Sequence, residues 1–592
     1  MKSDLFNDLN NEQKAAVEAV TGPSIILAGA GSGKTRVLTY KVRNLIENLH
    51  IDPSRIMMVT FTNKAAAEMK ERVNRQLGFI GTFHSFGVRV LRRYGIHIGL
   101  GSDFVIYDEN DREDVVKDVL KKLDISKKYT PSYIINRISG AKDQLIGEDR
   151  YGELFKDYSS EVIGTVYKQY QKTLSKNNAV DFDDLIYKTV KLFIQSPDIL
   201  ARYHELFQYI LVDEFQDTNY AQYQLTKYLG AKYHNVTVVG DFSQSIYSWR
   251  GAEIRNLEKF KDDFPKVQTF HLEKNYRSTQ NILDFAYDVI SKNQTHPILK
   301  LHTDNKHGDD VTIQMLENEQ YEAFYIAENA IRLVQGNGMD YSSVAVLYRI
   351  NAQSRVIEEA LLHQGIPYVL VGGTRFYERK EVKDIISYIR LVINPNDDIS
   401  LNRVIKIGKK RYEEFKKLFE KLEGQEQKPT VDLIDEIVRS TNYLDLFSTE
   451  DESDLARLEN IKELRSVALS FPEVHEFLEQ IALVESEYSE SEKLKKDKKG
   501  VHLMTLHQAK GLAFPYVFIA GVEEGILPHS RSIDDLYELE EERRLFYVGI
   551  TRAREKLYIT HAQKRFFFGR RTTNQISRFI EEENSYENQD YF

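Results

Sequence analysis

The chain has 592 residues, 42% of them hydrophobic and 29% charged, which is the balance of an ordinary globular protein. A chain of this length exceeds a single hydrophobic core, so we expect about three to four domains. Cysteine is absent, which excludes disulfides, thiol nucleophiles and zinc–thiolate sites. The formal net charge of −10 gives no global sign of nucleic-acid binding, yet it does not exclude binding through a local basic groove.

The first residues of the chain, Met1–Gln13, contain no apolar signal region. No apolar run approaches the length that crosses a bilayer. The lack of cysteine fits a reducing compartment. We therefore expect a cytoplasmic protein without a membrane partner.

Short apolar strands that end in polar loops recur in two groups. The first group consists of Ser24–Leu27, Ile56–Thr60, Tyr209–Val212 and Val236–Val239. The second group consists of Val344–Leu347, Val501–Thr505, Val517–Ala520 and Leu557–Thr560. Helical stretches alternate with these strands, and this alternation predicts parallel α/β sheets that bind ligands at the carboxyl ends of their strands.

Long charged stretches of helical period interrupt both groups of strands. The simplest interpretation is an α/β fold with two parallel-sheet domains, each carrying a mainly helical insertion. The predicted domains are 1–106 with 178–272, its insertion 107–177, then 273–374 with 496–592, and its insertion 375–495. The lysine-rich segment Lys493–Gly500 is predicted to be an exposed linker.

The first strand runs into AGAGSGKT at 28–35, and a helix is expected to follow. This is a P-loop arrangement, with Ala28 in place of the first glycine of the general pattern. Backbone N–H groups would hold the phosphates of a nucleotide, Lys34 the β- and γ-phosphate charge, and Thr35 a magnesium ion. The predicted nucleotide-binding residues are Ala28, Gly29, Ala30, Gly31, Ser32, Gly33, Lys34, Thr35 and Arg36. The alternative is a glycine-rich turn that binds nothing.

The strand Tyr209–Val212 ends in two acids, Asp213 and Glu214, where a P-loop protein needs them. Asp213 would hold the magnesium ion, and Glu214 would polarise the water that attacks the γ-phosphate. Two solvated carboxylates at a strand end are the alternative. The residues that follow, Phe215–Thr218, favour the catalytic interpretation because they extend the acids to DEFQDT.

A second set of phosphate-binding candidates lies near the other end of the chain, in GITRAR at 549–554. Its arginines are of the kind that reach the γ-phosphate of a nucleotide from another domain. If both motifs face one nucleotide, the ATP site lies across a cleft that hydrolysis opens and closes. A solvated surface charge is the alternative for any single arginine.

Further short motifs follow one another along the chain. The full series is Leu9–Gln13, Ala28–Thr35, Thr60–Ala66, Gly81–Ser85, Asp181–Leu185, Asp213–Thr218, Gln244–Ala252, Asn275–Ser278, Tyr348–Arg355, Thr505–Leu512 and Glu541–Arg544, which leads into Thr551–Ala553. In these motifs and their order, the chain resembles the UvrD/Rep/PcrA family of superfamily 1A DNA helicases, most closely its PcrA branch. The resemblance covers nearly the whole chain and implies two RecA-like domains.

The resemblance also implies roles at the ATP site. Gln13 would read the adenine edge, and Tyr276 would stack on the face of the base. Arg277 and Arg552 would contact the γ-phosphate from the second RecA-like domain, and Gln244 would sense that phosphate. The implied catalytic residues are Lys34, Asp213, Glu214, Gln244, Arg277 and Arg552, and the implied cofactors are ATP and Mg²⁺.

A track for single-stranded DNA is implied as well, with aromatic rings that stack on bases and polar groups that hold the backbone. Its implied residues are Phe61, Thr82, His84, Phe182, Tyr247, Trp249, Arg250, Asn351, His529 and Phe568. Trp249 is the only tryptophan and lies in a Gly- and Arg-rich segment, which weakens the alternative of core packing. Phe566–Gly569 resembles the family's strand-separation pin, and a hairpin buried under its own domain is the alternative.

The chain departs from the family pattern at three places. In Gly511–Phe514, Ala513 replaces a glutamate that contacts the ribose in relatives, so we expect weaker or slower ATP use rather than none. Gly240–Ser243 lacks acids that relatives carry. Ile407–Lys410 replaces an Arg-Gly-Ile-Gly turn in a second insertion that is shorter than in relatives, which puts duplex binding and regulation in question.

The predicted function is an ATP-dependent 3′→5′ DNA helicase and translocase that acts on single strands and on junctions with duplex. The shorter second insertion leaves open a translocase that displaces proteins but unwinds poorly alone. Ala513 leaves open a DNA-binding scaffold that ATP gates, and the P-loop alone leaves open a small-molecule kinase. Repair or replication-initiator proteins are the implied partners, with a monomer as the default state and self-association left open.

Overall fold

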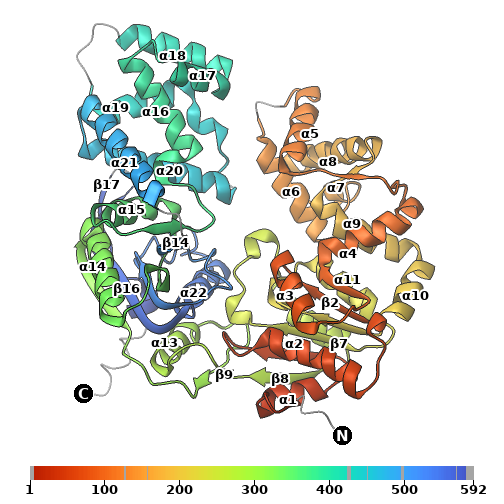
Figure 1. The fold of residues 1–592 in the computed structure, drawn as a ribbon. Helices are drawn as coiled ribbons and strands as arrows, with labels where there is room; N and C mark the ends of the chain where they lie inside the picture. Colours follow the sequence, from red (N-terminus) through yellow and green to blue (C-terminus); the bar gives the residue numbers. More distant parts are fainter. Residues whose placement is uncertain are drawn as a thin grey trace. The chain divides into compact units, whose positions relative to one another are not determined.

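The computed structural model consists of two compact units, each described here by itself (Figure 1). Met1–Ser278 with Ile290–Asn305 form the first unit, and Thr279–Val289 with Lys306–Phe592 form the second. The structure describes residues 6–125, 128–155, 158–422, 428–449, 451–494, 499–567 and 570–581.

The first unit is built on a six-stranded parallel sheet in the order β3-β2-β6-β7-β1-β8. Its strands are β1 (Ser24–Ala28), β2 (Ile56–Thr60), β3 (Phe79–Thr82), β6 (Tyr209–Val212), β7 (Val236–Gly240) and β8 (Gln268–Leu272). Alternate residues of β1 belong to separate cores, with Ile25 and Leu27 on one face and Ile26 on the other. Because both faces of the sheet are covered at its centre, β1, β2 and β7 are buried along their whole length, whereas the edge strand β8 is polar and largely exposed.

Helices of the first unit begin at residues that belong to the motifs. Asn10 caps α1 through a capping box, Thr62 caps α3, and Asp181 caps α9. The helices that surround this sheet are α1 (Asn11–Glu18), α2 (Lys34–Arg43), α3 (Asn63–Val73), α4 (Phe83–Tyr94), α9 (Phe182–Gln195), α10 (Pro197–Leu206), α11 (Tyr220–Gly230) and α12 (Asn256–Asp263). Short polar side chains thus fix both the helix starts and the loops that precede them.

The first insertion has a core of its own and lies at one end of its unit (Figure 1). Its helices are α5 (Glu109–Lys122), α6 (Pro131–Asp143), α7 (Tyr151–Leu154) and α8 (Tyr158–Lys176). The chain enters and leaves it through two paired strands, β4 (Val105–Ile106) and β5 (Ala179–Val180). Ile134, Ile138 and Tyr167 are fully buried in its core.

The second unit is built on a seven-stranded sheet in the order β11-β16-β15-β12-β14-β13, with β17 antiparallel to β16. Its strands are β11 (Thr312–Asn318), β12 (Val344–Tyr348), β13 (Tyr368–Leu370), β14 (Val501–Thr505), β15 (Phe514–Ala520), β16 (Ala553–Phe567) and β17 (Arg570–Thr573). Tyr348 lies opposite both Thr505 and Ala520, so the loops that follow these three strands meet at one edge.

Helices of the second unit divide into those around the sheet and those of the insertion (Figure 1). Around the sheet lie α13 (Gln280–Ile290), α14 (Glu319–Asn337), α15 (Ser354–His363) and α22 (Leu536–Ile550). The insertion contains α16 (Lys380–Ile393), α17 (Asp398–Ile407), α18 (Lys409–Leu422), α19 (Thr430–Thr441), α20 (Glu452–Ser470) and α21 (Val474–Leu494). A further short pair, β9 (Lys274–Asn275) with β10 (His302–Thr303), belongs to the first unit.

The predicted α/β fold with two parallel sheets and two helical insertions is confirmed, as are all eight predicted strands. The strand predicted at Leu557–Thr560 is longer than expected, because β16 continues to Phe567 and turns back as β17. Of the predicted linker Lys493–Gly500, the first two residues belong to the end of α21, and residues 495–498 lie outside the described residues. Among the helices that the structure describes, none combines the length and apolar character needed to cross a membrane.

Candidate functional site

The P-loop joins the end of β1 to the start of α2 at Lys34, as predicted. Gly31 and Gly33 have φ angles of 68° and 89°, in the left-handed region that favours glycine. A side chain at Gly29 would overlap Leu301, so the backbone passes that residue closely. No side chain in the described chain caps the N-terminus of α2, which suits that helix end to an anion.

Three carbonyl groups of the P-loop are engaged by neighbouring segments. Gln13 Nε2 donates to Ser32 O at 2.8 Å, Asn275 Nδ2 to Ala30 O at 2.6 Å, and Tyr276 N to Gly31 O at 3.1 Å. Helix α1 and the segment after β8 therefore hold the loop in place from outside. A loop held in this way is preorganised for phosphate without having to order on binding.

The two acids after β6 lie close to the P-loop. Thr35 Oγ1 donates to Asp213 Oδ2 at 3.5 Å, and Lys34 Nζ lies 3.9 Å from Glu214 Oε2. Glu214 has a φ of 49°, an uncommon conformation for a side chain other than glycine, and such residues cluster at active sites. The predicted metal ligands Thr35 and Asp213 are thus brought together as oxygen donors of the kind that Mg²⁺ prefers.

The electrostatic surroundings of Asp213 favour a cation at this place. Burial, followed by the neighbouring charge of Glu214, raises the pKa of Asp213 to about 7. A buried carboxylate that Lys34 compensates only in part favours a further positive charge. The residues present therefore fit Mg²⁺, which Asp213 and Thr35 would hold.

We expect the affinity for Mg²⁺ to fall as the pH is lowered through about 7, because protons compete for the Asp213 carboxylate. Without the cation, the raised pKa stabilises the folded state at pH values below about 4, and this contribution is lost as the pH rises through 7. Calorimetric titration of Mg²⁺ with a non-hydrolysable ATP analogue at pH 6 and pH 8 measures the first effect. Asp213→Asn should abolish the pH dependence, exposed Asp52→Asn should keep it, and equal affinities at both pH values would contradict the assignment.

A hydrogen-bonded path leads from the acids after β6 to the loop after β7. Gln216 Nε2 donates to Glu214 Oε2 at 2.6 Å, and Asp241 N donates to Gln216 Oε1 at 3.1 Å. Gln244 Nε2 then donates to Asp241 Oδ2 at 2.5 Å. Gln244, the predicted γ-phosphate sensor, is buried at the end of this path. A displacement of Glu214 would therefore move, through these hydrogen bonds, the loop that also carries Trp249.

Tyr276 and Arg277 belong to the unit of the P-loop, although the predicted second domain starts at residue 273. The hydrogen bond of Asn275 to the P-loop and the pairing of β9 with β10 account for this placement. The Tyr276 ring is half-exposed, its hydroxyl accepts from Asn10 Nδ2 at 3.0 Å, and Lys274 Nζ lies 5.7 Å from the ring centroid. A Cβ on Gly31 would lie 2.9 Å from Arg277 Cβ, so Arg277 borders the P-loop.

Arg552, the second predicted γ-phosphate arginine, lies in the second unit and is only 1% exposed. Its Nε donates to Val548 O at 2.8 Å and its Nη1 to Leu512 O at 3.0 Å. Phe514 N donates to Arg552 O at 2.9 Å, so the backbone on both sides of Ala513 is tied to this arginine. The guanidinium must exchange these bonds before it can contact a phosphate.

Two other predicted nucleotide-binding residues also engage backbone groups of their own unit. The Gln13 amide that donates to the P-loop accepts from Asn10 N at 3.3 Å through Oε1. Arg36 Nη2 donates to Asp8 O at 2.7 Å, and its guanidinium lies 5.5 Å from the Tyr40 ring centroid. An adenine or phosphate that binds these side chains would replace those contacts.

The aromatic residues predicted for the DNA track form a group beside the loop after β7. The rings of Phe61 and Tyr247 are nearly parallel, at 4°, with centroids 6.3 Å apart. Trp249 is 49% exposed and lies 6.4 Å from Tyr247. The Arg250 guanidinium lies 4.4 Å from the Trp249 ring, a cation–π contact that leaves much of the indole exposed.

A second group of predicted DNA-binding residues surrounds the start of α9. Phe182, its first residue, is 51% exposed and meets the His84 ring edge-on at 6.0 Å. Burial lowers the pKa of His84 against the opposing pull of Asp183, which favours a neutral imidazole at pH 7. Thr82 is buried, and its Oγ1 caps α4 by accepting from Ser85 N at 3.2 Å, so its side chain already has a structural partner.

The remaining predicted DNA-binding residues lie in the second unit. Asn351 begins η9 (Asn351–Gln353) after β12, and its carbonyl accepts from Arg379 Nη1 at 3.2 Å. His529 Nε2 lies 3.3 Å from Glu459 Oε1, which joins the loop after β15 to α20 of the insertion. Phe568 lies outside the described residues.

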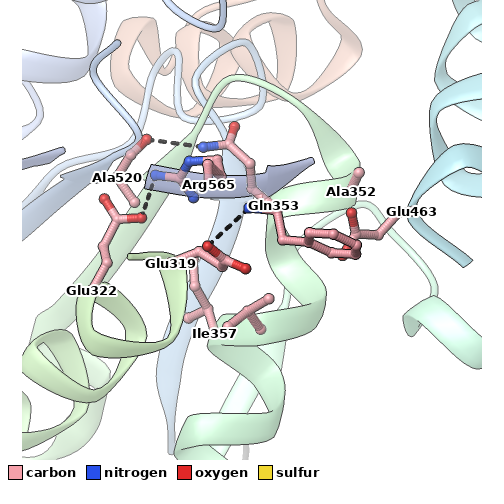
Figure 2. A pocket seen from close by; sticks show the side chains of 10 residues that line it. Glu319, Glu322, Ala352, Gln353, Ile357, Glu463, Ala520 and Arg565 are labelled. Carbon is pink, nitrogen blue, oxygen red and sulfur yellow. Dashed lines mark hydrogen bonds and ion pairs between the residues drawn. The ribbon is translucent and has the colours of Figure 1, made fainter. Parts of the chain in front are cut away.

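A buried ionic cluster anchors β16 close to its antiparallel pairing with β17. Figure 2 shows Arg565 beside Glu322, and Arg565 Nη2 donates to Glu322 Oε2 at 2.6 Å and to Glu523 Oε1 at 2.5 Å. Burial alone would raise the pKa of Glu523, but the Arg565 guanidinium holds it below its usual range. A cavity of about 20 Å³, large enough for one water, adjoins the cluster. Its lining includes Glu319, Glu322, Gln353, Glu463 and Arg565.

We expect Arg565→Ala to destabilise the second unit by about 3–5 kcal/mol, because it leaves Glu322 and Glu523 buried without their countercharge. Differential scanning calorimetry measures the lowered melting temperature. Arg578→Ala is the matched control, since the Arg578–Glu524 pair is partly exposed and removing it should cost about 1 kcal/mol or less. Equal effects of the two substitutions would argue against an anchoring role for the cluster.

Sequence reasoning gave no role to two residues that the structure brings into the site, nor to a third that lies outside it and contacts a neighbouring loop. Asn275 and Gln216 lie inside motifs of the series described above. A side-chain amide close to the end of a strand was the sequence feature that could have indicated their roles. Asp143, at the end of α6, contacts Asn219 in the loop after the acids. No sequence pattern indicates that contact, because the two residues lie 76 positions apart.

Comparison with known proteins agrees with this geometry. Residues 9–265 match the family model described as the UvrD/REP helicase N-terminal domain. Residues 270–454 and 441–564 match the model of the UvrD-like helicase C-terminal domain. Together the two models cover most of the chain and are consistent with two RecA-like domains.

Curated relatives match over almost the entire chain. Proteins named ATP-dependent DNA helicase PcrA from Staphylococcus epidermidis, Staphylococcus aureus and Bacillus subtilis are each 42% identical to it. Each alignment covers 98% of this chain and 86% of the relative. The P-loop, the paired acids and the arginine motif lie within the matched residues. The chain therefore belongs to the UvrD/Rep helicase family.

Proposed function

We propose that this chain is an ATP-dependent DNA helicase that translocates along single-stranded DNA. The observation that carries the proposal is the hydrogen-bonded path from Glu214 through Gln216 and Asp241 to Gln244. It joins a P-loop site to the loop that carries the exposed Trp249, within one unit. The two helicase family models and the name shared by the relatives support the same activity.

In the proposed reaction the P-loop N–H groups and Lys34 hold the phosphates of ATP. Glu214 polarises the attacking water and accepts its proton, which yields ADP and inorganic phosphate. Mg²⁺, held by Thr35 and Asp213, would neutralise phosphate charge when bound. Arg277 and Arg552 are the proposed residues that stabilise charge on the γ-phosphate in the transition state.

Single strands and their junctions with duplex are the proposed DNA substrates. Phe61, Tyr247 and Trp249 would stack on bases, a sequence-tolerant contact because every base has an aromatic face. The 3′→5′ direction follows from the family resemblance. ATP turnover would alter the position of the loop after β7 and thereby the grip on the bases.

A second candidate is a translocase that displaces proteins from DNA but unwinds poorly by itself. The shorter second insertion favours it, because that insertion resembles the element that grips duplex in relatives. Comparing the unwinding of a forked duplex with the displacement of streptavidin from a biotinylated strand separates the two. Displacement without unwinding would select the second candidate.

The direct test measures ATP hydrolysis with and without single-stranded oligothymidine, followed by unwinding of duplexes with a 3′ or a 5′ tail. We expect the strand to stimulate hydrolysis and only the 3′-tailed duplex to be unwound. Hydrolysis that single strands do not stimulate would overturn the motor proposal in favour of an ATP-gated scaffold. Unwinding of the 5′-tailed duplex alone would overturn the proposed direction.

A further inference from the structure

Asp143 lies where the first insertion meets two loops of the sheet domain. It is the last residue of α6, and its Oδ1 accepts from Asn219 Nδ2 at 2.5 Å. A Cβ built on Gly251 would overlap Asp143 Oδ2, so this carboxyl group also packs against the turn at Gly251. Asn219 follows the DEFQDT motif directly, and Gly251 directly follows Trp249 and Arg250.

The neighbouring residue fixes the end of α6 to a third element. Lys142 Nζ lies 2.6 Å from Asp181 Oδ2 and 3.0 Å from Asp184 Oδ1, with all three side chains fully buried. Asp181 caps α9, whose first residue is the exposed Phe182. Consecutive residues of the insertion thus contact the residue that follows the acid motif, the turn at Gly251 and the start of α9.

The two loops that Asp143 touches are also bonded to each other. Glu253 N donates to Thr218 O at 3.0 Å, and Asn256 Nδ2 donates to the same oxygen at 2.9 Å. Asn219 Oδ1 accepts from Gln222 N at 2.8 Å and so caps α11. Movement of the acid motif and movement of the Trp249 turn therefore converge on the junction at Asp143.

We propose that Asp143 is a positioning residue that couples the nucleotide site to the DNA-binding turn by holding Asn219 and Gly251 against the first insertion. The inference rests on the proposed motor function and deepens it, because it assigns part of the coupling to the insertion. Asp143 touches neither nucleotide nor the acids themselves, and it acts through Asn219.

The charges around Asp143 make this junction dependent on pH. Burial, followed by Asp183, raises the pKa of Asp143 to about 8, against the opposing effects of Arg112 and the hydrogen bond from Asn219. The charged groups that face it are Arg112 on α5 and Asp181 and Asp183 on α9, while α11 presents the amide of Asn219. At pH 7 the carboxyl group is mostly protonated, so it packs against Gly251 without a net charge. Ionisation above pH 8 would add a negative charge beside Asp181 and Asp183 and loosen the junction.

The test uses the full chain and compares three variants with the wild type. Asp143→Asn keeps the shape and the hydrogen bond but cannot ionise, whereas Asp143→Ala removes the contact. Asp149→Asn, an exposed carboxylate of the same insertion, is the matched control. The readouts are ATP hydrolysis without DNA, its stimulation by oligothymidine, and oligothymidine affinity, each measured from pH 6.5 to 9.

We expect DNA stimulation in the wild type and in Asp149→Asn to fall as the pH rises through about 8. Asp143→Asn should keep its stimulation up to pH 9, and Asp143→Ala should lose about 5-fold or more of it at pH 7 with basal hydrolysis unchanged. Thermal melting monitors folding of each variant. Normal stimulation of Asp143→Ala, or an Asp143→Asn profile that still falls near pH 8, would overturn the inference. If DNA fails to stimulate even the wild type, it is the proposed function that is overturned.

Discussion

Replacing Glu214 with glutamine is expected to lower kcat for ATP hydrolysis by about 10²- to 10⁴-fold, because the amide cannot accept the proton of the attacking water. ATP binding should be retained, since Lys34 and the P-loop backbone remain in place. The glutamine is close in shape and can still meet Gln216, which lies 2.6 Å from the native carboxylate. Steady-state hydrolysis and equilibrium binding of a fluorescent ATP analogue measure the two effects.

Glu205→Gln is the matched control for this substitution. Glu205 is an exposed carboxylate of the same unit and pairs with Lys232 at the surface. The Glu205→Gln substitution should leave the rate of ATP hydrolysis unchanged. A Glu214→Gln variant that hydrolyses ATP at the rate of the control would remove Glu214 from the proposed chemistry and leave the base unassigned.

Replacing Trp249 with alanine is expected to weaken the binding of single-stranded DNA by about 5- to 100-fold, the loss that follows from removing one base-stacking ring. Unstimulated ATP hydrolysis should stay the same, because Trp249 lies in the turn beyond Gln244 and contacts Tyr247 and Arg250. Fluorescence anisotropy of labelled oligothymidine gives the affinity. A titration of ATP hydrolysis against the same strand gives the concentration needed for stimulation.

Tyr321→Ala serves as the control for the loss of an exposed aromatic ring. Tyr321 is 58% exposed on α14 of the second unit and belongs to none of the motifs. The Tyr321→Ala substitution should alter neither the affinity for oligothymidine nor the stimulation of ATP hydrolysis by it. If Trp249→Ala left DNA-stimulated turnover intact, Trp249 would have no role in the proposed DNA track. That result would favour the rival interpretation of the chain as a small-molecule kinase.

Much of the nucleotide site could be predicted from contiguous sequence. The P-loop needs glycine where φ is positive, and Gly31 and Gly33 meet that need with φ of 68° and 89°. The apolar strand before Asp213 is confirmed as β6, which brings that acid to Thr35 across the sheet edge. These features could be predicted from residue type and short spacing, because the backbone geometry of a strand and of the loop after it depends on residues that are close in sequence.

The states of the individual side chains could not be predicted in the same way. The motif around Arg552 predicts an arginine that reaches a phosphate, yet this guanidinium is buried and bonded to Val548 and Leu512. The motif that contains Thr82 predicts a contact with DNA, but in the structure the Thr82 hydroxyl caps α4. These outcomes depend on which partners surround the side chain after folding, and no pattern within one segment specifies them.

The sequence by itself determined the nucleotide chemistry, the two parallel sheets and the family, because each depends on residues that are neighbours along the chain. Only the tertiary structure decided how those parts are connected. The path from Glu214 to Gln244 crosses from Gln216, on the loop after β6, to Asp241, on the loop after β7, and the contact of Asp143 with Asn219 joins residues 76 positions apart. Such connections arise from packing of the sheet and the insertion, since burial brings distant polar groups together and requires each to find a partner.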